Sequence, residues 1–151
     1  MRKLIIAALL LAGSLSAQKA SYTFFGKHKC NSNHVFRVSG VPKLGTTLII
    51  TIPQPAFFFG AVGFLITGTK LATPIDVSAF GRGSCGTLRV RPLAITFAPT
   101  NSQFPGEYKV RMTIPNARQL IGVQFFQQTG VLYGFPLINL SAQAGHGVIG
   151  T

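Results

Sequence analysis

Acidic residues are nearly absent from this sequence of 151 residues, which sets only Asp76 and Glu107 against 14 lysines and arginines. Hydrolysis of a glycoside by two carboxylates would need these two side chains to meet across one cleft. No G-x-S-x-G motif is present to position a serine nucleophile. The sequence therefore predicts a protein that is not an enzyme, and it indicates no cofactor.

Tryptophan is absent, and no long apolar run follows the N-terminal segment. A membrane-spanning helix needs roughly 18 consecutive apolar residues. The longest candidate, residues 56–66, is interrupted by two glycines and is interpreted as a strand that is either buried on both faces or twisted at Gly60. We expect no transmembrane segment in the mature chain, and we expect the 13 phenylalanines to fill the core.

Residues 1–17 have the layout of a secretory signal peptide. Arg2 and Lys3 precede an apolar stretch, which is followed by small residues ending at Ala17. Cleavage there would leave residues 18–151, a length typical of one domain. The protein is expected to be secreted, to the extracellular space or to a periplasm.

Only two cysteines are present, Cys30 and Cys85. In an exported protein such a pair favours a disulfide, because that compartment does not keep thiols reduced. A bridge over a loop of this length would stabilise the fold by roughly 4 kcal/mol. The alternative is a metal site in which His28, Cys30 and His34 are joined by Cys85 or His146. That site would require reduced cysteines, so we expect no bound metal.

Short apolar runs with a period of two indicate strands, and Gly, Pro, Asn and Ser separate them. The fold class predicted is all-β, an antiparallel β-sandwich of the jelly-roll or Ig-like type with about 8 to 10 short strands. One helical turn is expected after Asn116. The predicted strands are 21–25, 35–38, 46–52, 56–68, 87–91, 94–98, 107–114, 121–128, 136–140 and 147–150.

Several stretches together resemble a family of small uncharacterised domains, rich in Gly, Leu and Pro, from secreted bacterial proteins. The stretches are GKHKC (26–30), SGVPKLGTTLIITI (39–52), PIDVSAFGRGSC (74–85), RVRP (89–92), TIPNARQLIGVQFFQQ (113–128) and LINLSAQAGHGVIG (137–150). Such domains often end much larger surface proteins. The resemblance implies a β-sandwich-like module with one disulfide, no catalytic residues and no established ligand. This chain differs from the family pattern in being strongly basic.

Gly81, Gly83 and Gly86 have the G-x-G-x-x-G spacing of dinucleotide-binding loops. That chemistry also needs a preceding strand, a following helix and an acidic residue about 20 positions later. The sequence indicates none of these, so the glycines are interpreted as a tight turn that leads Cys85 into a strand. Asp76 is expected to cap or brace this turn, and Glu107 to be solvated at a strand start.

Basic residues have the clearest pattern among the polar residues. Arg89 and Arg91 alternate with apolar residues in TLRVRP, and Lys109 and Arg111 do so in EYKVRM. If these two strands shared a sheet, four cations would gather on one face, with Arg37 or Arg82 nearby. Such a face would bind polyanions, and the alternative is that these cations only keep the sheet soluble.

Two functions are therefore expected, and both are non-enzymatic. The first is a structural or adhesive module of the bacterial cell surface or matrix. The second is capture of an acidic polysaccharide, or of another cell-surface polyanion such as lipopolysaccharide phosphate, on a face made by Arg82, Arg89, Arg91, Lys109 and Arg111. Nucleic acid is not expected as a specific partner, because no aromatic residues lie between these cations to stack on bases.

Overall fold

The computed structural model describes residues 18–27, 35–53, 61–81, 83–98, 107–133 and 137–151. These residues form nine strands and two short 3-10 helices, with no α-helix among them. All pairings between the strands are antiparallel, so the predicted all-β antiparallel class is confirmed. Within the same ranges, no helix is long and apolar enough to cross a membrane.

Nine strands and two 3-10 helices follow one another along the described part of the chain. The strands are β1 (Ser21–Phe25), β2 (Arg37–Ser39), β3 (Thr47–Pro53), β4 (Val62–Asp76), β5 (Thr87–Phe97), β6 (Glu107–Thr113), β7 (Gln124–Leu132), β8 (Ile138–Leu140) and β9 (Ala144–Val148). The 3-10 helices are η1 (Val77–Phe80) and η2 (Arg118–Leu120).

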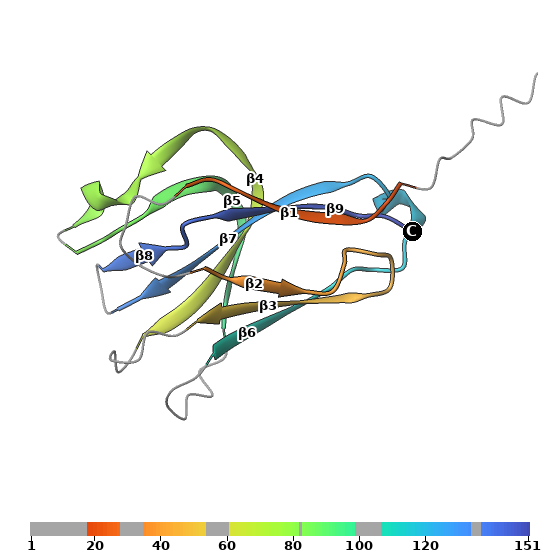
Figure 1. The fold of residues 1–151 in the computed structure, drawn as a ribbon, viewed down its shortest axis with the longest axis horizontal. Coiled ribbons are helices and arrows are strands. Elements are labelled where there is room, and N and C mark those ends of the chain that lie inside the picture. The colour runs from red at the N-terminus through yellow and green to blue at the C-terminus, as the bar shows by residue number, and fades with distance from the viewer. Residues whose placement is uncertain (1–17, 28–34, 54–60, 82, 99–106, 134–136) are drawn as a thin grey trace, which may run out of the picture.

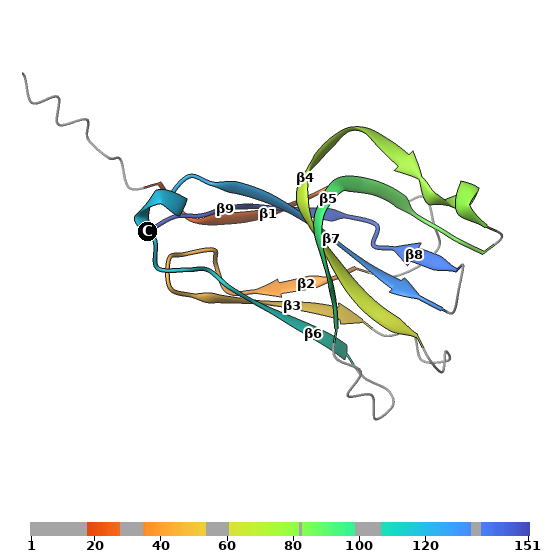
Figure 2. The same ribbon diagram turned by 180° about the vertical axis from the view of Figure 1, so that it is seen from behind.

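The strands form two sheets that lie as separate layers in Figure 1, and Figure 2 shows them from behind. The large sheet has the order β1-β9-β7-β4-β5, and β8 pairs with β7 beside this path. The small sheet has the order β2-β3-β6. Three of these seven pairings, β2–β3, β4–β5 and β7–β8, join strands that are consecutive in the chain, and the other four do not.

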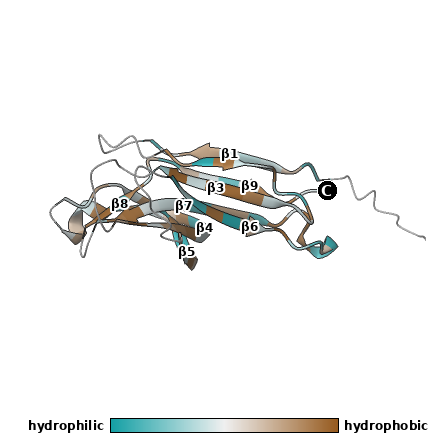
Figure 3. Ribbon diagram, turned by 90° about the horizontal axis from the view of Figure 1, so that it is seen from below, coloured by the Kyte–Doolittle hydropathy of each residue, from teal (hydrophilic) through white to brown (hydrophobic). Residues whose placement is uncertain are grey.

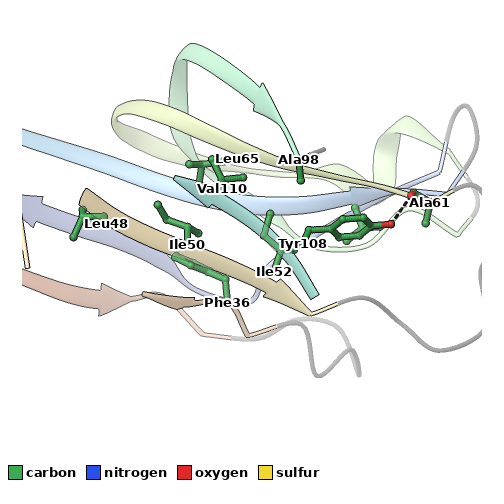
Figure 4. Close-up of a cluster of buried hydrophobic side chains, with 10 residues drawn as sticks. Phe36, Leu48, Ile50, Ile52, Ala61, Leu65, Ala98, Tyr108 and Val110 are labelled. Atoms are coloured by element: carbon green, nitrogen blue, oxygen red, sulfur yellow. Dashed lines mark hydrogen bonds between the residues drawn. The ribbon is translucent and has the colours of Figure 1, made fainter. Parts of the chain in front are cut away.

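The space between the sheets holds one buried hydrophobic cluster, here called the inner core. In β3, Leu48, Ile50 and Ile52 alternate with residues that face outward, as the period of two predicted. Val110 and Tyr108 of β6 lie opposite Ile50 and Ile52. Fully burying a Leu or Ile side chain contributes about 1.5–3 kcal/mol. The inner core, most of it labelled in Figure 4, comprises Phe36, Leu48, Ile50, Ile52, Ala61, Leu65, Ala98, Tyr108, Val110 and Val131.

A second buried cluster lies on the opposite face of the large sheet, and we call it the outer core. It consists of Phe64, Ile66, Val77, Val90, Leu140 and Ala144. Leu65 of β4 belongs to the inner core, whereas its neighbours Phe64 and Ile66 belong to the outer core. The prediction that this strand is buried on both faces is confirmed for residues 63–66, and residues 56–60 lie outside the described ranges.

Two glycines of β9 make room for aromatic rings that lie across the strand. A Cβ atom on Gly145 would lie 2.0 Å from the Tyr22 hydroxyl oxygen. A Cβ atom on Gly147 would lie 2.2 Å from the ring of Phe125. Real Cβ atoms do not approach so closely, so these positions exclude any other residue unless the rings move.

Several strand boundaries differ from the predicted ones. The two strands predicted on either side of Pro92 are one strand, β5, because a β-bulge lets β5 continue past the proline. β4 extends beyond Gly68 to Asp76, and β7 and β9 are displaced from residues 121–128 and 147–150. The predicted helical turn is present as η2, but it is capped by Ala117 without a side-chain hydrogen bond, so the capping role expected for Asn116 is wrong.

Candidate functional site

The basic residues selected from the sequence lie on two different sheets. Arg89 and Arg91 belong to β5 of the large sheet, whereas Lys109 and Arg111 belong to β6 of the small sheet. β5 pairs with β4 and β6 pairs with β3, so the condition of one shared sheet is not met. The expected face of four cations is therefore wrong as drawn, and Arg82 lies outside the described residues.

Arg89 has a structural environment. Its guanidinium donates a hydrogen bond of 3.0 Å to the carbonyl oxygen of Lys27. A Cβ atom added at Gly26 would lie 2.5 Å from Arg89 Nε, so the side chain packs directly on this glycine. Arg89 thus holds the end of β1 against β5, while Arg91 is exposed.

Three cations do share a surface, on the outer side of the small sheet. Arg37 and Lys109 both lie in register with Thr51, and Arg111 lies in register with Ile49 in the next outward-facing row. The Glu107 carboxylate lies 3.9 Å from Arg37 and 4.0 Å from Lys109. These exposed pairs contribute about 0–1 kcal/mol to stability. We call Arg37, Lys109 and Arg111 the basic face.

The carboxylates have the surroundings that the sequence predicted. The Asp76 carboxylate caps η1 by accepting a hydrogen bond of 3.0 Å from the Ser78 amide. Glu107 is exposed at the first position of β6. Asp76 ends a strand of the large sheet and Glu107 begins a strand of the small sheet.

The G-x-G-x-x-G stretch forms a turn, as interpreted from the sequence. The Ser84 amide donates to the Gly81 carbonyl oxygen at 3.1 Å. Cys85 then exchanges main-chain hydrogen bonds of 2.9 Å with Ile138 and Leu140, which attach the turn to β8. The element that follows is strand β5 rather than a helix. Cys30 lies outside the described ranges, so the Cys30–Cys85 disulfide stays a prediction.

Only Cys85 and His146 of the alternative metal ligands lie within the described ranges. His28, Cys30 and His34 lie outside them. His146 stacks on Phe126, with ring centroids 4.6 Å apart, and its Nε2 lies 3.1 Å from Gln124 Oε1. Among the residues that the structure describes, no three potential ligands come together.

Two buried glutamines of β7 connect neighbouring elements. The Tyr22 hydroxyl donates to Gln127 Oε1 at 3.0 Å. The Arg89 amide donates to Gln128 Oε1 at 2.9 Å, and Gln128 Nε2 donates to Thr87 O and Ser141 O at 2.8 and 3.1 Å. Both side chains are thus structural rather than available to a ligand.

The tyrosines are likewise structural. Burial raises the pKa of Tyr22, Tyr108 and Tyr133 above the ordinary value of 10.0, because a phenolate would lose its hydration. The Tyr108 hydroxyl donates a hydrogen bond to the Ala61 carbonyl oxygen, as Figure 4 shows. The tyrosines therefore stay neutral hydrogen-bond donors at physiological pH.

An apolar cavity of about 270 Å³ opens on the outer face of the large sheet, and we call it the apolar pocket. Its lining exposes no polar surface. Strands β4, β5, β7 and β8 form its floor and walls, and η1 contributes one side. The lining residues are Phe64, Ile66, Val77, Phe80, Leu88, Pro92, Ile95, Phe97, Leu132, Ile138 and Leu140.

The bulge between β4 and β5 shapes this pocket. Thr67 lies opposite Ala94 and Gly68 opposite Pro92, so β5 carries one extra residue, Leu93. A Cβ atom at Gly68 would lie 1.9 Å from the Arg91 carbonyl oxygen, and only glycine allows this approach. The bulge bends β5 and re-aims the apolar side chains that follow.

Large apolar side chains at the pocket are exposed to solvent. The exposed fractions are 60% for Phe80, 51% for Ile95 and 58% for Phe97. Leu93, the extra residue of the bulge, is not part of the lining and is 75% exposed. The arrowhead end of β5 has the brown colour of hydrophobic residues in Figure 3. The expectation that the phenylalanines fill the core is therefore wrong for Phe80 and Phe97. The alternation of Leu93, Ile95 and Phe97 can be read from the sequence. It predicts a strand face buried against another layer, whereas these three side chains are exposed.

Lys70 lies on the same face of β4 as Phe64 and Ile66 of the pocket lining. Lys70 is opposite Val90 of the outer core, two positions from Gly68 on the same face of β4. Its Nζ lies 5.5 Å from the centre of the Phe25 ring, and Phe25 packs against the outer core. A positive charge thus lies on the face of the large sheet on which the apolar pocket opens.

Comparison with known proteins gives no match: no family model, curated protein or solved structure matches this chain. The resemblance to small Gly/Leu/Pro-rich secreted domains accordingly stays a prediction.

Proposed function

We propose that this protein is a secreted, non-enzymatic adhesive or structural module of a bacterial cell surface or matrix, and that it attaches through the apolar pocket. The observation that carries the proposal is a cavity whose lining exposes no polar surface, bordered by the exposed rings of Phe80 and Phe97. Exposed apolar surface of this kind marks an interaction site. The separation of Asp76 and Glu107 on different sheets supports the non-enzymatic assignment.

The chemistry of the lining favours a hydrocarbon chain as the occupant. A peptide would bring main-chain amides and carbonyls that need hydrogen-bond partners, and the lining has none to offer. An alkyl chain needs no such partner, and each methylene removed from water contributes about 0.8 kcal/mol. Lys70 would attract an anionic head group. The proposed ligand is an anionic amphiphile with a single alkyl chain.

The finer fold assignment belongs to the same proposal. Two facing sheets around an inner core support a β-sandwich, of the jelly-roll or Ig-like type. The predicted Cys30–Cys85 disulfide would fasten the turn before β5, and thereby one wall of the apolar pocket.

Displacement of a fluorescent naphthalene sulfonate by laurate tests the proposal. We expect Phe80→Ser to weaken laurate binding about tenfold, because a partly exposed ring contributes about 1–2 kcal/mol when the ligand covers it. Val41→Ser, at an exposed position outside the pocket lining, is the matched control and leaves binding unchanged. Lys70→Gln weakens laurate binding but not dodecanol binding, because dodecanol has no charge. Equal loss in Phe80→Ser and Val41→Ser, or no laurate binding at all, would contradict the proposal.

Capture of an acidic polysaccharide is the second candidate function. It is supported by the basic face, where Arg37, Lys109 and Arg111 occupy two neighbouring rows on one side of the small sheet. Glu107 offsets part of this charge. The apolar pocket is the better-supported site because its shape and chemistry are both specified.

A further inference from the structure

Strand β5 is an edge of the large sheet, and no other strand of the described residues pairs with its free side. The Ala98 amide donates to the Gly63 carbonyl oxygen at 2.8 Å, so this pair is hydrogen-bonded to β4. In an antiparallel ladder the main-chain groups point alternately toward and away from the partner. The amides and carbonyls of Phe97 and Ile95 therefore point away from β4, toward the free side.

Within the described ranges, this edge has none of the protection that edge strands usually have. Natural edges carry charges, prolines or covering segments that prevent pairing with another chain. β2 and β6, the edges of the small sheet, carry Arg37, Lys109 and Arg111. From Leu93 to Phe97, β5 has no charge and no proline, and it exposes three large apolar side chains. Such an edge is suited to pairing with another strand.

The residue pattern of β5 is complementary to itself. In an antiparallel pair of two copies centred on Ile95, the two Ile95 residues face each other and Leu93 faces Phe97. Each cross-strand pair is then apolar, an arrangement that stabilises a sheet. Arg91 is four residues from the centre, so the two copies of Arg91 would be about 26 Å apart at 3.3 Å per residue. Their repulsion is screened over about 8 Å at physiological salt.

We propose that β5 pairs in antiparallel fashion with β5 of a second copy of this chain, with the two-fold axis at Ile95. Residues that face each other across strands point to the same side of the sheet. The two apolar pockets then open on the same face and adjoin at the axis, where Leu93 of each copy lies beside Phe97 of the other. The dimer thus makes one continuous apolar surface from two pockets. It extends the proposed function without requiring a ligand.

Sedimentation velocity over a hundred-fold range of protein concentration tests the pairing. We expect a dimer for the unmodified protein and a monomer for Ile95→Lys, since that change sets two cations opposite each other at the axis. Ile95 is half exposed, so the variant keeps its fold, which circular dichroism checks. Val41→Lys is the matched control and remains dimeric. A monomer at every concentration, or a dimer that survives Ile95→Lys, overturns the proposal.

Cross-linking provides a second and geometric measurement. Facing residues of a hydrogen-bonded pair have Cα atoms about 5.5 Å apart, which suits a disulfide. Ile95→Cys should therefore form a covalent dimer under mild oxidation, whereas Arg91→Cys should not. A cross-link at position 91 and none at 95 would contradict the register. A monomer that still binds laurate would contradict the proposed dimer but not the proposed function. A dimer that does not bind laurate would contradict the proposed function but not the proposed dimer.

Discussion

Gln128 shows how one side chain can replace missing main-chain pairing. The register between β4 and β5 shifts between Lys70 and Ile75. Near this shift, the side-chain amide of Gln128 makes hydrogen bonds to the main chain of Thr87 and Arg89. It also binds the Ser141 carbonyl oxygen on the other side. These main-chain groups are partly or fully buried, and losing a hydrogen-bond partner there costs about 1–3 kcal/mol each.

We therefore expect Gln128→Leu to destabilise the protein by about 3 kcal/mol, measured by urea unfolding. Gln124→Leu is the matched control, because Gln124 lies in the same strand, is exposed, and its side chain bonds the His146 ring rather than the main chain of a neighbouring strand. Its effect is expected to be within about 0.5 kcal/mol. Similar losses in the two variants would show that Gln128 does not have this bridging role.

At the residue scale, the sequence predicted local features and missed those that depend on distant partners. Asp76 and the glycines of its turn were predicted correctly, because a cap and a turn involve neighbours in sequence. Arg89 was expected to face solvent, but it packs on Gly26, 63 positions earlier in the chain. No local pattern specifies such a contact.

Among the elements, β4 and β5 depart most from a regular ladder. Their bulge requires Gly68, whose Cα lies close to the Arg91 carbonyl group. The bulge places Ile95 and Phe97 at the pocket, so its geometry affects both stability and binding.

We expect Gly68→Ala to destabilise the protein by about 1–3 kcal/mol, since the new methyl group would meet a main-chain atom that cannot move aside easily. Thr69→Ala, at the neighbouring exposed position, is the control and is expected to change stability by less than about 0.5 kcal/mol. Thermal unfolding followed by circular dichroism measures both. Tolerance of alanine at position 68 would mean that β5 can close onto β4 without the bulge.

The alternation of apolar residues predicted most strands, and it failed where a strand continues through an irregularity. Residues 87–91 and 94–98 were predicted as separate strands, yet a bulge lets β5 continue through Pro92. Residues 69–76 have few large apolar side chains and so gave no strand signal. They follow the rest of β4 into an exposed arm, which Figure 2 shows rising away from the other strands.

For the whole molecule, charge is the property that the sequence predicts most directly. The chain has a formal net charge of +12. What the sequence could not predict was the sheet to which each cationic strand belongs, because pairing joins segments far apart in the chain. Arg91 and Lys109, 18 residues apart, lie on separate sheets.

Polyanion binding therefore gives a prediction that separates a specific face from total charge. We expect the double variant Lys109→Gln with Arg111→Gln to bind heparin more weakly at low salt. The slope of log K against log salt concentration should become less steep by about one for each cation removed. The control removes two exposed cations elsewhere, through Arg91→Gln with Arg118→Gln. Chromatography on immobilised heparin at several salt concentrations measures both. Equal weakening in the two double variants would show that total charge, rather than the basic face, governs binding.

β4 contributes residues to both the inner and the outer core, so the unfolding of the two cores is coupled. Leu65 anchors the strand in one cluster, and Phe64 and Ile66 anchor it in the other, so neither cluster can come apart while the other keeps its packing. The molecule is expected to melt as a single cooperative unit. The proposed secretion would expose the protein to proteases, and such cooperativity would leave them no long-lived half-open form to cut.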